Sequence, residues 1–203
     1  MQQSLQIALL TLLSHFLFVV DGELSCKDMR VNATRLSATC CQLTRPSLDT
    51  GNEDCRAELK LPQKRRFSFV EQYTINMCVE ECNFIGSGYI DVDPPYRLDI
   101  GRIRTNLKST LPEPQATSVP FMVKAYTKCE VFLELHGTHF ALHLPELEFI
   151  KNPCKPFSLH ITICVRMHAM QKCPKEFYAN SAQCQMAQKY FTQCMDDIET
   201  SVG

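Results

Sequence analysis

Apolar positions recur with the period of an amphipathic helix in the last part of the chain. Phe177, Cys184, Ala187, Phe191, Cys194 and Ile198 follow one another at intervals of seven, three, four, three and four residues. Such intervals place side chains on one face of a helix. We therefore expect a packed amphipathic helix in this part of the chain, with Asn180 as its candidate N-cap and two cysteines in its buried stripe.

A second helix is predicted within 61–84, where "FSFVEQYTINMCVEECNF" contains neither proline nor glycine. Its apolar residues form two faces, one with Cys78 and Cys82 and the other with Val70, Tyr73 and Met77. A helix with two apolar faces is usually buried between neighbours. The alternative is that one face meets disulfides and the other a cavity.

Capping residues and prolines predict three more helices and a loop between two of them. Asp93, with Pro94 behind it and apolar residues at 96, 100, 103 and 107, predicts a helix start. A proline-rich loop over 112–120 follows, and Ser118 is the expected cap of a helix that ends before Gly137. The stretch "FSLHITICVRMHAMQK" predicts a helix that stops at Pro174, although its β-branched residues also fit a short strand.

The amino terminus has the features of a secretory signal. An apolar run over Ile7–Val20 is too short for a comfortable membrane span, and small residues precede a cleavage point after Gly22. No later stretch reaches about 18 uninterrupted apolar residues, so we expect no membrane span. Removing 22 of the 203 residues leaves 181, the length of one domain. We expect a signal peptide over 1–22, a loop-rich, disulfide-tethered extension over 23–54 and a helical domain over 55–203.

Charge excludes two classes of partner. The signal segment removes Asp21 and no basic residue, which leaves 21 acidic residues against the chain's 21 lysines and arginines. A balanced surface gives no electrostatic case for nucleic acid or an anionic membrane.

The cysteines predict disulfide bonds. Their number is even and the expected compartment is oxidising, which favours six bridges over free thiols. In "CVEEC", Cys78 and Cys82 lack the second closely spaced pair of a zinc site and the two-residue spacing of a redox motif. On a helix they share a face, so we expect them to bond two different partners. The twelve are Cys26, Cys40, Cys41, Cys55, Cys78, Cys82, Cys129, Cys154, Cys164, Cys173, Cys184 and Cys194.

Motifs for catalysis are weak, so we expect no enzyme and no cofactor. The sequence contains no G-x-S-x-G, no H-E-x-x-H and no phosphate-binding glycine loop. His136, His139 and His143 would share a helical face, but Gly137 and Pro145 disfavour an unbroken helix, so we expect a structural or surface role rather than a metal site. With His160 and His168 they are candidate pH sensors. Asn32 begins the sequon Asn-Ala-Thr, a candidate glycosylation site.

The cysteine spacing carries a resemblance. From Cys55, the numbers of intervening residues are 22, 3, 46, 24, 9, 8 and 10, and Pro174 directly follows Cys173. This spacing resembles the insect odorant-binding proteins, in particular the Plus-C subclass, whose members have extra cysteines and a proline after the sixth family cysteine. The stretch "CVRMHAMQKCPKEFYANSAQC" is the most specific part, and the likeness covers roughly residues 55–194.

The resemblance implies an all-α domain of six or more helices, stapled by disulfides around an apolar cavity. It implies the bridges Cys55–Cys82, Cys78–Cys164 and Cys129–Cys173, and leaves the other six cysteines unassigned. It also implies a carrier, secreted into sensillar lymph or another body fluid, that binds small hydrophobic ligands such as odorants or pheromones. A chemoreceptor and a second copy of the chain are further candidate partners.

Apolar pockets use aromatic and methionine side chains, which gives a set of candidate lining residues. These are Val70, Tyr73, Met77, Phe121, Met122, Tyr126, Phe132 and Leu133. Each taken singly also fits an ordinary core. The alternative functions are a protease inhibitor and a disulfide-rich interaction protein whose cavity has closed.

Overall fold

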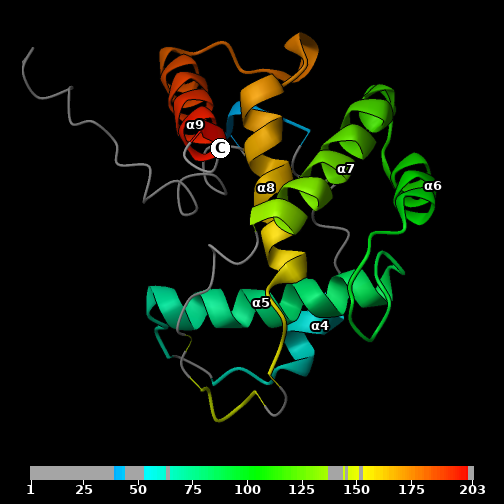
Figure 1. The fold of residues 1–203 in the computed structure, drawn as a ribbon, viewed down its shortest axis with the longest axis vertical. Coiled ribbons are helices and arrows are strands. Elements are labelled where there is room, and N and C mark those ends of the chain that lie inside the picture. Colours follow the sequence, from blue (N-terminus) through cyan, green and yellow to red (C-terminus); the bar gives the residue numbers. More distant parts are fainter. Residues whose placement is uncertain are drawn as a thin grey trace, which may run out of the picture.

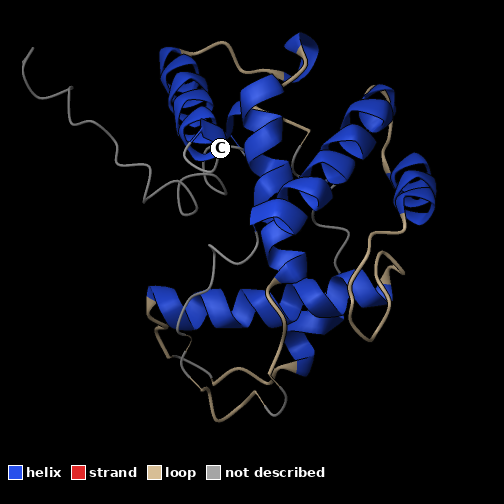
Figure 2. Cartoon of the chain, in the orientation of Figure 1, coloured by secondary structure: helices blue, strands red, loops and turns tan. Residues whose placement is uncertain are grey.

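The computed structural model shows an all-α fold. It describes residues 39–43, 53–62, 65–136, 144, 146–150 and 153–200, and within these ranges it contains six α-helices and no strand (Figures 1 and 2). The predicted signal segment, Asn32 and most of the predicted 23–54 extension lie outside the described residues. The helices are α4 (Glu53–Glu58), α5 (Phe69–Gly86), α6 (Ile100–Thr110), α7 (Val119–His136), α8 (Phe157–Lys172) and α9 (Ala182–Thr200), with 3-10 turns η2 (Gln115–Ser118) and η4 (Lys175–Phe177).

Helix α8 is the centre of the fold. It packs against α5, α7 and α9, and Figure 1 shows it running between them. Ile161, Val165 and Ala169 are fully buried along it. The predicted helix is confirmed and the strand alternative is wrong, because burial on several sides outweighs the modest helix penalty of its β-branched residues.

Helix α5 crosses one end of α8 and confirms the helix predicted there. It starts with a capping box in which the Ser68 hydroxyl accepts from the Glu71 N–H and the Glu71 carboxylate accepts from the Ser68 N–H. These two hydrogen bonds fix where the helix begins.

The helix start predicted at Asp93 is wrong. The helix begins at Ile100, where the Asp99 carboxylate accepts from the Arg102 N–H at 2.8 Å. Pro95 disfavours a helical conformation at Pro94. The Leu98 N–H instead donates to the Glu130 carboxylate on α7, and the Asp99 N–H donates to the Tyr89 carbonyl, so the segment before Ile100 stays outside the helix.

Two other predicted caps differ from the structure. Helix α7 does follow Ser118, but the Ser118 hydroxyl donates to the Gln115 carbonyl instead of capping α7. At α9 the cap is Ser181, whose hydroxyl accepts from the Cys184 N–H at 3.2 Å, while Asn180 accepts from the Gln185 side chain. Gly137, the predicted end of α7, lies outside the described residues.

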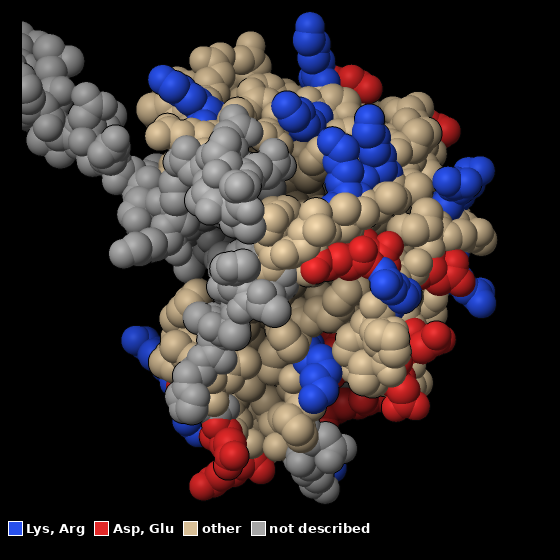
Figure 3. Space-filling view, viewed as in Figure 1, with Lys and Arg blue, Asp and Glu red and all other residues tan. Residues whose placement is uncertain are grey.

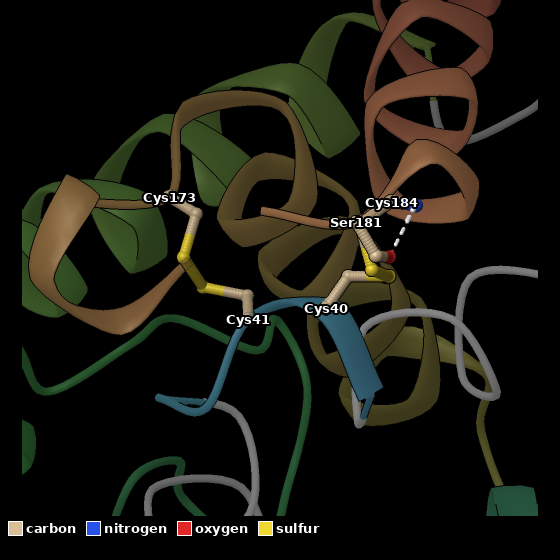
Figure 4. The surroundings of a disulfide bond; sticks show 5 residues. All are labelled: Cys40, Cys41, Cys173, Ser181 and Cys184. Atoms are coloured by element: carbon tan, nitrogen blue, oxygen red, sulfur yellow. Dashed lines mark hydrogen bonds between the residues drawn. A yellow bond between two sulfur atoms is a disulfide. The ribbon is translucent and has the colours of Figure 1, made fainter. Parts of the chain in front are cut away.

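Two neighbouring cysteines attach the segment 39–43 to the carboxyl-terminal part of the fold. Cys40 bonds Cys184 at the start of α9, and Cys41 bonds Cys173 at the end of α8 (Figure 4). The Gln42 N–H donates to the Phe177 carbonyl and the Ala179 N–H to the Cys40 carbonyl. Cys40, Cys41 and Leu43 are buried in the main core, so this part of the extension is packed as well as bonded.

Candidate functional site

The cysteines of "CVEEC" attach α5 to two different segments. Cys82 bonds Cys55 on α4, and Cys78 bonds Cys154 in the segment before α8. The prediction of two separate partners is confirmed. A helix pinned twice on one face is held firmly against both neighbours.

Of the three bridges implied by the resemblance, Cys55–Cys82 is confirmed. The pairings Cys78–Cys164 and Cys129–Cys173 are wrong, because Cys164 on α8 faces Cys129 on α7, with a Cα–Cα distance of 5.7 Å. Cys173 lies beyond that helix, where it reaches Cys41. Disulfides form only where Cα atoms lie within about 7 Å, so helix packing decides the partners.

An open hollow of about 620 Å³ lies on the cysteine face of α5. Both bridges of "CVEEC" form part of its wall, and its apolar surface comes from side chains of α5, the turn after α4 and the segment before α8. We call it the cysteine hollow. Its lining residues are Cys55, Glu58, Leu59, Lys60, Cys78, Glu81, Cys82, Ile85, Glu148, Phe149, Ile150 and Cys154.

Hydrogen bonds fix the polar edge of the cysteine hollow. The Glu81 carboxylate accepts from the Tyr96 hydroxyl at 2.8 Å and from the Lys155 N–H at 3.2 Å. Burial, together with the hydrogen bond to Glu81, raises the pKa of Tyr96 to about 12. The tyrosine is therefore a neutral donor throughout the physiological range, and Glu81 ties two loops to α5.

Ring contacts support the outer wall of the hollow. Phe149 packs against Phe67 with ring centroids 5.8 Å apart, and the Arg65 guanidinium lies over Phe67. Leu147 is buried, and its carbonyl accepts from the Ile150 N–H. The 146–150 segment is thus held in place by packing on the chain that leads into α5.

The eight predicted lining residues fall into separate places. Tyr73 and Met77 form a small buried cluster with Leu159, whereas Met122 and Tyr126 belong to the main core. Phe121, Phe132 and Leu133 are half-buried against that core, and Val70 is exposed. None of the eight lines either of the two hollows that we describe in the structure.

The cysteine hollow therefore lies on the face of α5 that carries cysteines, not on the face of Tyr73 and Met77. Sequence reasoning missed Leu59, Ile85, Phe149 and Ile150 as candidate lining residues. Ile85 could have been predicted, because it follows Cys78 and Cys82 on the same helix. No pattern in the sequence pointed to Phe149. Its position depends on the long-range bridge between Cys78 and Cys154.

The histidines show no shared site among the described residues. His136 packs on Phe132, His160 is buried, and His168 stacks on Phe121 with ring centroids 5.6 Å apart. His139 and His143 lie outside the described residues. The described part of the chain contains no group of three His, Cys, Asp or Glu that could hold a metal ion.

Comparisons with known proteins add no relative. No family model, no curated protein and no solved structure matches the chain. Within the described ranges, none of the helices has the length and apolar character to cross a membrane.

Proposed function

We propose that this protein is a secreted carrier that reversibly binds small hydrophobic molecules, without chemical change, in the cysteine hollow. The observation that carries the proposal is a recess of about 620 Å³ whose surface is more apolar than polar, with two disulfides in its wall and the charged residues Glu58, Lys60, Glu81 and Glu148 also in its lining. This volume lies within the range of about 300–1,000 Å³ typical of small-molecule sites. Burying about 200 Å² of apolar ligand surface would contribute about 5 kcal/mol before the ordering costs of binding.

Disulfides support both parts of the proposal. Bridges of this number persist in oxidising compartments, which fits secretion. They also tie α4 and Cys154 to α5, which supports a recess that does not collapse when it is empty.

The order of pairing supports the resemblance to odorant-binding proteins. Cys55, Cys78, Cys82, Cys129, Cys154 and Cys164 pair first with third, second with fifth and fourth with sixth. The three bridges that the resemblance implies follow the same order when Cys164 and Cys173 are counted as the fifth and sixth cysteines. The observed order requires Cys154 and Cys164 in those places, so that Pro174, after Cys173, no longer follows the sixth cysteine. Odorants and pheromones are therefore the first ligands to test, and a chemoreceptor and a second copy of the chain remain candidate partners.

The test is displacement of a fluorescent apolar probe from oxidised protein comprising residues 23–203. Saturable binding at micromolar concentrations is expected, with competition by some members of a panel of volatiles and lipids. Ile85→Trp should fill the hollow and weaken binding at least tenfold, whereas Val92→Trp, at a 66% exposed position outside it, should have no effect. Absence of uptake by folded protein with its bridges intact would overturn the proposal.

One observation favours an interaction protein with a closed cavity as the second candidate. Met122 and Tyr126, which we predicted to border a cavity, are fully buried in the main core. Capture of a protein partner by a sample that takes up no apolar probe would support this alternative.

A further inference from the structure

A second hollow, of about 570 Å³, lies between α6, η2 and α7. None of its lining residues is shared with the cysteine hollow. We call it the basic hollow. Its lining residues are Arg104, Lys108, Ala116, Thr117, Val119, Pro120, Val123 and Lys124.

All the charged residues that line the basic hollow are cations. Arg104 and Lys108 lie one turn apart on α6, and Lys124 faces them from α7. All three are exposed, and none forms an ion pair with another described residue. Three cations around one recess, without a carboxylate in its lining, produce a positive potential that attracts an anion.

The surroundings add to this potential. Helix α7 begins at Val119, in the wall of the hollow, and its first turn contains no acidic residue that would offset the three cations. Burial lowers the pKa of His168 nearby. The positive charges of Lys128 and Lys124 on α7 and of Lys172 on α8 lower it further. Figure 3 shows several Lys and Arg side chains grouped over α7, whereas most Asp and Glu side chains in this view lie lower.

The floor of the basic hollow is apolar and belongs to the main core. Val119 and Val123 are 4% and 6% exposed, and Ala116 and Pro120 lie beside them. Because the two valines pack in the core, the floor is rigid. The hollow thus combines a cationic rim with a hydrocarbon floor, which suits a molecule with one anionic head and one apolar chain.

We propose that the basic hollow binds a monomeric amphipathic anion, namely the carboxylate of a medium-chain fatty acid. The carboxylate contacts Arg104, Lys108 and Lys124, and the alkyl chain lies on Val119 and Val123. A guanidinium matches the geometry of a carboxylate, since it can donate two parallel hydrogen bonds. This site is independent of the carrier function proposed for the cysteine hollow.

Calorimetric titration of the oxidised protein with dodecanoate and with dodecanol tests the proposal. Dodecanoate is expected to bind at least tenfold more tightly than dodecanol, with an affinity that falls as salt increases. The triple variant Arg104→Gln, Lys108→Gln and Lys124→Gln should abolish this preference. The matched control, Arg56→Gln, Lys175→Gln and Lys189→Gln, changes the net charge equally at exposed positions outside both hollows and should preserve the preference.

Three results of the titrations would overturn the proposal. They are equal affinity for the acid and the alcohol, an unchanged preference in the Arg104, Lys108 and Lys124 variant, and an equal loss in the control. Sedimentation with phosphatidylglycerol vesicles, but no binding of dodecanoate, would also overturn it, in favour of a membrane surface. Ile85→Trp should leave dodecanoate binding at the basic hollow intact, so failure of one hollow is distinguishable from failure of the other.

Discussion

The hydroxyl of Tyr73 lies 2.6 Å from Nε2 of His160, although the two residues are 87 positions apart in the sequence. Both side chains are buried, and the contact joins α5 to α8 next to the bridge between Cys78 and Cys154. A hydrogen bond between buried groups is costly to remove on one side, because the remaining group loses a partner away from water.

The first prediction concerns this contact. Tyr73→Phe should lower the free energy of unfolding by about 1–2 kcal/mol, as measured by chemical denaturation of the oxidised protein. Tyr178→Phe is the matched control, because the buried Tyr178 hydroxyl has no hydrogen-bond partner among the described residues. That variant should be neutral or slightly stabilising, and an equal loss in both variants would contradict the assigned role of the Tyr73 hydroxyl.

The second prediction concerns pH. Burial, with a smaller contribution from Lys128, Lys172 and Lys124, lowers the pKa of His168 from 6.5 to about 4. Between pH 4 and pH 6.5, His168 binds a proton in the unfolded chain but not in the folded protein. The contribution of His168 to the free energy of unfolding is therefore complete above pH 6.5 and is lost as pH falls toward 4. His168→Gln should reduce the acid-induced loss of stability by about 1 kcal/mol, a figure discounted for partial exposure.

The pKa can also be read directly from the imidazole resonances. Lys128→Gln should raise the pKa of His168, whereas Lys155→Gln, in the segment before α8, should leave it unchanged. A pKa near 6.5 in the unmodified protein would contradict the burial of this ring.

The third prediction is the disulfide map. Non-reducing proteolysis and mass spectrometry should recover the five bridges of the described residues, none of whose cysteines is free. Since twelve cysteines are present, Cys26 and Cys194 are then expected as the sixth pair. A peptide linking Cys78 to Cys164 would contradict the helix packing on which the cysteine hollow depends.

The fourth prediction compares two bridges of "CVEEC". The cysteines of the Cys78–Cys154 bridge are 76 positions apart and those of Cys55–Cys82 are 27 apart. In the chain-entropy model, replacing each pair by alanine should lower stability by about 4.5 and about 3.5 kcal/mol, respectively. Both double variants should also weaken probe binding at the cysteine hollow, and unchanged binding would show that neither bridge shapes it.

Much of the fold could be predicted because the helices are encoded locally. The stripe of α9 and the uninterrupted stretch of α5 were sufficient to predict both helices. The start of α6 was not, because the contact between Leu98 and Glu130 that holds the preceding segment against α7 joins residues 32 positions apart. Asp93 and Asp99 are both suitable N-caps for α6, and only contacts between distant residues decide which of them is used.

The cysteine hollow was less predictable than the helices. The two faces of α5 were evident from the sequence, but nothing local indicates which face meets an open recess. That choice depends on the bond between Cys78 and Cys154, and spacing alone does not determine disulfide partners. The same uncertainty explains why Cys164 and Cys173 were assigned to the wrong partners.

The adjacent bridges of Cys40 and Cys41 have a consequence for what a protease can release from the protein. Exposed Lys175 lies between Cys173 and Cys184, and both of these cysteines are bonded to neighbouring residues of one short segment. A protease that cuts the backbone after Lys175 would therefore release nothing, because α9 would remain covalently attached through Cys184. Such a nicked molecule would keep its full mass until its disulfides were reduced.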